Sequence, residues 1–449
     1  MSPSARVMLA LAVYPLAASP QAPREAPPSP RPPEHILVKA AHLIDGKADA
    51  ARDGFAVLVE GDRIQKVGPA AELQAQAAGA KVIDLGNAWL LPGLIDAHTH
   101  VLLQGDITAA EYDEQLLKES TPYRALRASA SVRTSVMNGF TAIRDLETEG
   151  AMYADVDVKT AIARGVIPGP RMFVATRSLA PTGTYPLTGY SWELRMPEGV
   201  QIADGPEGLR KAVREQVKYG ADWIKFYADR KYYKTNDPHR PLRSWVNYTP
   251  EEAKAIVDEA HRLGRKVAAH AMGWDGIDSA LKAGADSIEH GDGLTDDLID
   301  RVVRQGVYWC PTIYVGLWVA QGRGGIWPDM IPMEREAFAK ALKRGVRIAY
   351  GTDAGGYAWT ENQAKELAVM VQYGMAPMAA LKSATSVAAA LLEPICPPQA
   401  AHCASNDIGS IAPGKYADLV AVDADPLKDI AVMQRVHFVM KGGEVLKSR

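Results

Sequence analysis

Strand-like segments alternate with helix-like segments from residue 94 to residue 353, and this alternation constrains the fold more than any other feature of the sequence. A strand that is followed by a helix returns beside its predecessor as a parallel strand. One helix is marked at its start by a capping box of Thr249 and Glu252, with Pro250 in the first helical position. Eight such units predict an α/β protein with a (β/α)8 barrel, in which functional residues gather at the carboxyl ends of the strands. The expected strands are 94–100, 141–145, 171–175, 223–227, 266–270, 287–290, 308–311 and 347–353.

Both ends of the chain carry short strand-like runs that are separated by turns rather than by helices. Segments 36–38, 55–59 and 63–67 are separated by glycine-containing turns, which favours antiparallel pairing. Near the C-terminus, residues 417–422 and 436–445 form similar short strand-like runs. We therefore expect both ends to build one small β-sandwich domain. The predicted boundaries are 36–91 for its first part, 92–400 for the barrel and 401–449 for its second part.

The N-terminal residues have the order of regions that is typical of a signal peptide. Arg6 precedes the apolar run 7–13, and small residues follow that run. The run is too short to span a bilayer. We therefore expect a signal peptide over residues 1–22, a Pro-rich linker over 23–35, and a periplasmic or secreted protein. The alternative is a disordered tail on a cytosolic protein.

Charge and cysteine content narrow the possible partners. The 449 residues include 50 basic and 53 acidic side chains, and this balance gives no reason to expect nucleic acid or an anionic membrane as a partner. The spacing of the three cysteines fits no zinc-binding pattern. Cys396 and Cys403 flank a Pro-rich loop and could form a disulfide in an oxidising compartment, which agrees with export. Cys310 is expected in the core.

Two histidines end the segment 92–100, which begins as an apolar run. Side chains two residues apart on a strand lie on the same side, so His98 and His100 can reach one metal ion. In a barrel, further ligands should come last in their strands. A lone histidine at a strand end is more often a hydrogen-bonded polar residue than a metal ligand. Several such residues at one end of one barrel, however, predict a metal site. The other strand-end residues are Lys225, His270, His290 and Asp353.

Lys225 lies in the middle of the apolar strand 223–227. Such surroundings disfavour the ammonium form and lower the pKa of a lysine. One interpretation is a core lysine whose ammonium group reaches solvent or pairs with an acid. The functional hypothesis is a neutral amine that captures carbon dioxide and becomes an anionic carbamate, which is able to bridge two cations.

Together with segments 351–355 and 408–420, these motifs resemble the amidohydrolase superfamily. They are most similar to its imidazolonepropionase-related branch of binuclear metal-dependent dipeptidases, prolidases and ochratoxin-hydrolysing amidohydrolases. The resemblance extends from about residue 36 to the end of the chain. It implies a homo-oligomer with two divalent metal ions, often zinc. In the implied ligand set His98 and His100 bind one ion, His270 and His290 bind the other, carboxylated Lys225 bridges them, and Asp353 lies beside the first.

The implied reaction is attack by a metal-activated hydroxide, with Asp353 as the general base and then as the general acid. Two positions depart from the branch, because Tyr185 and Trp359 stand where histidines are common. Both changes introduce larger aromatic surface, which favours a pocket for bulky apolar or aromatic groups. Cations that follow Lys225 could hold a substrate carboxylate, although a solvated charged loop is an equally simple interpretation. The predicted substrate contacts are Tyr185, Tyr227, Arg230 and Trp359.

The predicted protein is therefore a carboxypeptidase-like amidohydrolase that acts on a small-molecule amide. The expected substrates carry an amide bond to a C-terminal hydrophobic or aromatic amino acid, as in dipeptides, N-acyl amino acids and ochratoxin-like amides. An alternative is a cyclic amidohydrolase that opens an imidazolone or lactam ring. A second alternative, of another class, is a non-catalytic metal-binding protein built on the same barrel.

Overall fold

The computed structural model describes residues 35–105, 108–185, 187, 189–396 and 406–449. These residues belong to one compact unit. The predicted signal peptide and Cys403 lie outside the described residues, so export and the disulfide stay predictions. None of the helices in the described segments combines the length and the apolar character that a membrane span requires.

The eight predicted strands are all present, and they run parallel to their neighbours. They pair in two sheets, with the strand orders β10-β9-β8 and β12-β11-β13-β16-β17-β18-β19. Their apolar side chains share one buried cluster with apolar side chains of the helices. The predicted strands are β8 (Leu94–Thr99), β9 (Phe140–Asp145), β10 (Arg171–Val174), β13 (Trp223–Tyr227), β16 (Lys266–Ala271), β17 (Ser287–His290), β18 (Tyr308–Cys310) and β19 (Arg347–Ile348).

The two parallel sheets are joined by isolated hydrogen bonds rather than by continuous ladders. β19 is shorter than the predicted strand 347–353, because the residues after it turn toward β8. The N–H of Ala97 donates to the carbonyl of Tyr350 at 2.8 Å, and at the other edge the N–H of Asp222 donates to the carbonyl of Val174 at 2.8 Å. The sequence did not indicate two short strands that extend the second sheet. These are β11 (Leu179–Ala180) and β12 (Gln201–Ile202).

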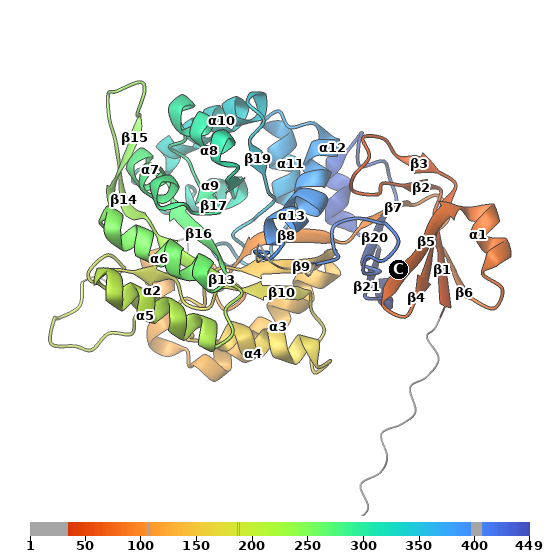
Figure 1. Ribbon diagram of the computed structural model, residues 1–449, viewed down its shortest axis with the longest axis horizontal. Coiled ribbons are helices and arrows are strands. Elements are labelled where there is room, and N and C mark those ends of the chain that lie inside the picture. The colour runs from red at the N-terminus through yellow and green to blue at the C-terminus, as the bar shows by residue number, and fades with distance from the viewer. Residues whose placement is uncertain (1–34, 106–107, 186, 188, 397–405) are drawn as a thin grey trace, which may run out of the picture. The chain divides into compact units, whose positions relative to one another are not determined.

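Helices surround the parallel strands (Figure 1). The predicted capping box at the start of α6 is confirmed, since Thr249 and Glu252 each accept a hydrogen bond from the backbone N–H of the other. Thr249 therefore fixes the start of this helix, which is one of the helices that surround the strands. The helices that follow the strands are α3 (Thr121–Met137), α4 (Ala154–Ala163), α5 (Gly205–Lys218), α6 (Pro250–Arg262), α7 (Trp274–Ala283), α8 (Asp296–Gln305), α9 (Ile313–Val319), α10 (Trp327–Lys343), α11 (Lys365–Gln372), α12 (Pro377–Lys382) and α13 (Ala388–Leu392).

Strands from both ends of the chain pair with one another. One sheet has the order β22-β21-β20-β7-β2-β3, and a second has the order β5-β4-β1-β6. Apolar residues from both ends, such as Val38 and Leu419, share one buried cluster. The strands are β1 (His35–Lys39), β2 (His42–Leu43), β3 (Arg52–Asp53), β4 (Phe55–Glu60), β5 (Arg63–Pro69), β6 (Lys81–Asp84), β7 (Trp89–Pro92), β20 (Leu419–Val422), β21 (Phe438–Lys441) and β22 (Glu444–Ser448).

Candidate active site

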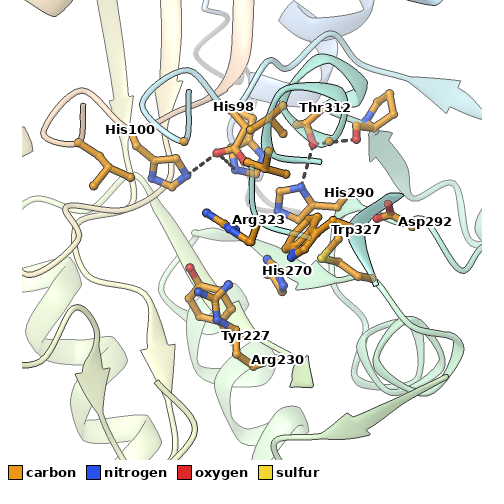
Figure 2. A pocket seen from close by; sticks show the side chains of 18 of the residues that line it. His98, His100, Tyr227, Arg230, His270, His290, Asp292, Thr312, Arg323 and Trp327 are labelled. Carbon is orange, nitrogen blue, oxygen red and sulfur yellow. Dashed lines mark hydrogen bonds and ion pairs between the residues drawn. The ribbon is translucent and has the colours of Figure 1, made fainter. Parts of the chain in front are cut away.

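Six residues that the sequence singled out line one cavity at the carboxyl ends of the parallel strands. Figure 2 shows four imidazole rings around one space, with Tyr227 beside His270. The ring centroids of His98 and His100 are 5.3 Å apart, those of His98 and His290 are 5.0 Å apart, and those of His270 and His290 are 4.6 Å apart. The structure therefore brings the predicted ligand set together. Its members are His98, His100, Lys225, His270, His290 and Asp353.

The buried ion pair of Arg144 and Glu289 fixes the imidazole of His98 through its Nδ1 atom. Nδ1 of His98 lies 2.8 Å from Oε2 of Glu289, and Oε1 of Glu289 accepts a hydrogen bond from Arg144 at 2.9 Å. Burial alone would raise the pKa of Glu289, but Arg144 and His98 hold it well below its usual range. With Nδ1 engaged, Nε2 of His98 is buried without a hydrogen-bond partner. Nε2 is thus the atom that a metal ion would use, and Glu289 orients it.

Asp353 faces both histidines of the first strand. Its Oδ1 lies 3.0 Å from Nε2 of His100 and 3.6 Å from Nε2 of His98, and the donor atoms of these three residues all lie within 4.8 Å of one another. Burial lowers the pKa of His98 to about 4. Burial opposes the charged form of His100 as well, but Asp353 outweighs it and raises the pKa of His100 to about 10. A divalent cation would take the place of that proton, so these residues fit a metal ion.

His270, His290 and Lys225 form the other half of the candidate metal centre. Nδ1 of His290 lies 2.8 Å from the hydroxyl of Thr312, and Nε2 of His270 lies 2.6 Å from the hydroxyl of Tyr232. Lys225 is 1% exposed, and burial lowers its pKa, as its strand setting predicts. Among the described residues, no carboxylate has an oxygen within 4.8 Å of the ring nitrogens of both His270 and His290 in such a group of potential metal ligands. A carbamate on Lys225 would supply the missing oxygen ligands.

The backbone is strained at three positions of the site. The φ angles of His290, Thr312 and Asp353 are 70°, 53° and 60°, in the left-handed region. Such residues cost about 1–3 kcal/mol each and persist only where their surroundings fix them. The N–H of Asp353 donates to the carbonyl of His98 at 2.7 Å. At Gly355 a Cβ would lie 2.2 Å from the carbonyl oxygen of His100, so glycine allows the chain to bring Asp353 against the first strand.

Three of the four predicted substrate contacts line the same cavity, namely Tyr185, Tyr227 and Arg230. The guanidinium of Arg230 lies 4.4 Å from the ring centre of Tyr185 and 5.2 Å from that of Tyr227. The fourth, Trp359, is not among the lining residues. Its buried indole N–H donates to the carbonyl of His100 at 3.3 Å. Trp359 therefore stabilises the backbone of a predicted ligand instead of contacting the substrate. Closeness to Asp353 in sequence gave no information about the direction of this side chain.

Two glutamates that the sequence analysis missed hold the tyrosines in place. The hydroxyl of Tyr227 donates to Oε2 of Glu147 at 2.6 Å, and the hydroxyl of Tyr185 donates to Oε2 of Glu149 at 2.9 Å. Burial raises the pKa of Glu147 to about 8. Both glutamates follow β9 by a few residues and so lie at the same edge as the predicted ligands. A search that had included the residues just beyond each strand would have found them.

An α/β fold with imidazoles, a buried lysine and a carboxylate at the carboxyl ends of parallel strands defines a hydrolase with a candidate metal centre. The chain belongs to the amidohydrolase family, whose model matches residues 89–446. Residues 56–80 match an imidazolonepropionase-like composite domain of bacteria. The resemblance drawn from the sequence motifs is therefore confirmed.

Individual relatives and solved structures agree with this family. The chain is 30% identical to ochratoxinase of Aspergillus niger over 443 aligned residues. The alignment covers 92% of this chain and 86% of that relative. It is similar to the crystal structure of a Xaa-Pro dipeptidase with bound methionine, with a TM-score of 0.79, 31% identity, and coverage of 92% of this chain and 100% of that chain. The crystal structure of the A. niger ochratoxinase matches with a TM-score of 0.76, 28% identity, and coverage of 93% and 96%.

We predict that Glu289→Gln weakens metal binding by about 10-fold to 100-fold, the range seen when a partner of a ligating histidine is lost. Glutamine has one acceptor oxygen in place of two, so it cannot accept from both Arg144 and Nδ1 of His98 and no longer fixes the proton on Nδ1. Metal retention against a chelator series measures the effect. Glu366→Gln is the matched control, because Glu366 is equally buried but accepts only the backbone N–H groups of residues 313 and 314. Equal metal retention by Glu289→Gln and the wild type would contradict the prediction.

Proposed function

We propose that this protein hydrolyses an amide bond to a C-terminal amino acid at a binuclear metal centre, in the manner of a carboxypeptidase. The observation that carries the proposal is the presence, in one cavity, of the whole predicted ligand set together with the cationic side chain of Arg230. The relatives support it, because one is named an ochratoxinase and another a Xaa-Pro dipeptidase. The family membership supports hydrolysis of a C–N bond.

We also infer the finer architecture that this site needs. The hydrogen bonds between the edges of the two parallel sheets support a closed (β/α)8 barrel. The core that both chain ends share supports a small β-sandwich domain beside it. In such a barrel all eight strands end at one mouth, which is where the cavity lies.

In the proposed centre His98 and His100 hold one divalent ion, His270 and His290 hold the other, and the carbamate of Lys225 bridges them. Imidazole and carboxylate ligands suit zinc and similar ions. When bound, the ions supply Lewis-acid polarisation of the amide carbonyl and lower the pKa of water. The buried ion pair behind His98 and the hydroxyl of Thr312 beside His290 keep two of the imidazoles in ligating orientations.

Asp353 performs the proton transfers of the proposed reaction. Its Oδ1 faces the space between the imidazoles. Burial alone would raise the pKa of this carboxyl, but His100 and His98 hold it well below its usual range. A carboxylate in this position accepts the proton of the attacking water and then delivers it to the departing amine nitrogen. The amide C–N bond breaks as that nitrogen is protonated, and the products are a carboxylic acid and an amino acid.

Arg230 is the proposed anchor for the carboxylate of the released amino acid. Its guanidinium packs on Tyr185 and forms no ion pair with a carboxylate of the described residues, so it is available to a ligand. The cavity is also lined by the apolar side chains of Pro311, Val315 and Val319, which supports a large hydrophobic or aromatic side chain on the substrate.

We expect Arg230→Ala to raise the KM for N-acetylphenylalanine by about 10-fold to 100-fold, because each 1.4 kcal/mol of lost carboxylate binding is a factor of ten. Turnover of N-acetylphenylalanine amide, which lacks the carboxylate, should change little. Steady-state kinetics on both compounds measures the difference. Lys231→Ala is the matched control, since this neighbouring cation is exposed and outside the cavity. An equal KM increase for both substrates would contradict carboxylate recognition.

A cyclic amide is the second candidate substrate. It is favoured by 26% identity over 392 residues to imidazolonepropionase of Streptomyces coelicolor. A panel of N-acyl phenylalanines and simple lactams separates the two candidates. Faster hydrolysis of the open-chain amides supports the main proposal, and exclusive opening of rings overturns it.

A further inference from the structure

Two further carboxylates line the cavity on the wall beside His290. Asp292 follows the end of β17 by two residues, and Glu334 projects from α10. Asp292 is 7% exposed and Glu334 is 4% exposed, so both are nearly removed from solvent. Neither was singled out by its sequence context, and neither has a role in the proposed metal centre.

No cation of the described residues forms an ion pair with either carboxylate, although the guanidinium of Arg323 lines the same cavity. Oδ2 of Asp292 is buried without a hydrogen-bond partner. The charged groups that face Glu334 are themselves acidic, namely Asp292 and Glu366. Burying two uncompensated carboxylates side by side costs several kcal/mol by the usual order of magnitude. A site of this kind is stabilised when a ligand brings a positive charge.

The surroundings favour an organic cation over a metal ion. Among the described residues, Asp292 and Glu334 belong to no group of three or more closely spaced metal-ligating side chains. The same cavity is lined instead by Met272, Val319 and Trp327, and Figure 2 shows Trp327 and Asp292 on the flank of the cavity that also carries His290. An indole ring and aliphatic side chains suit the stem and the charged head of an alkylammonium or alkylguanidinium group.

We propose that Asp292 and Glu334 form a subsite for a cationic group of the substrate, an ammonium or guanidinium carried on an apolar stem. The cation comes either from a basic side chain or from a free N-terminal amine. This inference rests on the proposed function and narrows its substrate class, because the apolar wall then contacts the stem while the acid pair binds the charged end. A purely hydrophobic side chain would leave both carboxylates uncompensated.

Paired substrates test the subsite in the metal-loaded enzyme. Ala-Arg and Ala-citrulline differ only in the charge of the side chain, and Ala-Phe and N-acetyl-Ala-Phe differ in the charge of the amine. We expect kcat/KM to favour the cationic member of one pair by at least about tenfold, which corresponds to about 1.4 kcal/mol. In Glu334→Gln and in Asp292→Asn this preference should fall to less than about threefold, or about 0.65 kcal/mol.

The matched control is Glu336→Gln on the same helix. Glu336 is exposed and pairs with Lys340, so its loss should leave the preference unchanged. Metal content is measured for each variant, because Asp292 lies close to His290. Equal rates within about twofold for both members of both pairs in the wild type, about 0.4 kcal/mol or less, would overturn the subsite.

A binding measurement separates failure of the subsite from failure of the proposed function. Butylguanidine and butylurea have the same shape and differ in charge, and calorimetry gives their affinities without any hydrolysis. We expect the wild type to bind butylguanidine at least tenfold more tightly than butylurea, and Glu334→Gln to bind both alike. If no amide is hydrolysed but this difference holds, the proposed function fails and the subsite stands. If amides are hydrolysed and the difference is absent, the subsite fails alone.

Discussion

Replacing Asp353 by asparagine is expected to reduce kcat for amide hydrolysis by about 10²-fold to 10⁴-fold, the contribution typical of a general acid–base group. The amide of asparagine cannot accept the proton of the attacking water or return it to the leaving amine. The carboxylate also lies 3.0 Å from Nε2 of His100 and 3.6 Å from Nε2 of His98, so it is placed to exchange a proton in the space between them. Single-turnover and steady-state rates on N-acetylphenylalanine measure the loss.

The same substitution should leave the fold intact. Asparagine tolerates the φ of 60° at this position better than most residues do, and the hydrogen bond from the backbone N–H of residue 353 to the carbonyl of His98 does not depend on the side chain. Metal content and thermal unfolding serve as controls. Wild-type kcat in Asp353→Asn with metal retained would remove Asp353 from the chemistry.

Lys225→Met is expected to lower the metal content from two ions per chain to one or none and to abolish turnover. The methionine keeps the buried apolar volume of β13 but cannot form the carbamate that would complete the ligands beside His270 and His290. The lysine is 1% exposed and burial lowers its pKa, which favours the neutral amine that reacts with carbon dioxide. Metal analysis and incorporation of ¹³C from labelled bicarbonate measure both effects.

Lys266→Met is the matched control for the loss of a lysine from a parallel strand, at a half-buried position. Lys266 begins β16, its ammonium donates to the carbonyl of Leu391, and it does not line the cavity. This variant should keep two ions and wild-type turnover. Two bound ions in Lys225→Met, or no ¹³C signal in the wild type, would contradict the bridging role of Lys225.

The parallel strands and the grouping of the candidate metal ligands could be predicted because both follow from local patterns in the sequence. Apolar runs of strand length mark each parallel strand, and the rule that ligands come last in a strand selected His270, His290 and Asp353 without knowledge of tertiary contacts. The family resemblance came from the same residues. The geometry of β19 was not predictable, because the residues after it leave the ladder to pair with β8 through single hydrogen bonds.

Residues that act through tertiary contacts escaped the sequence analysis. Arg144 and Glu289 come from different strands and meet only in the folded protein, although an acid inside the fully buried strand β17 was a usable signal. Asp292 and Glu334 are 42 residues apart in the chain and line one cavity only because α10 packs beside α8 and α9. Side chains on loops, such as that of Trp359, have no periodicity from which a direction follows.

Metal analysis of freshly purified protein, combined with hydrolysis assays before and after chelation, tests the central claim most directly. The account predicts two divalent ions per chain, loss of amide hydrolysis when they are removed, and recovery when zinc and bicarbonate are returned. Protein that binds no metal and cannot be reloaded, or that hydrolyses amides equally well without metal, would contradict it.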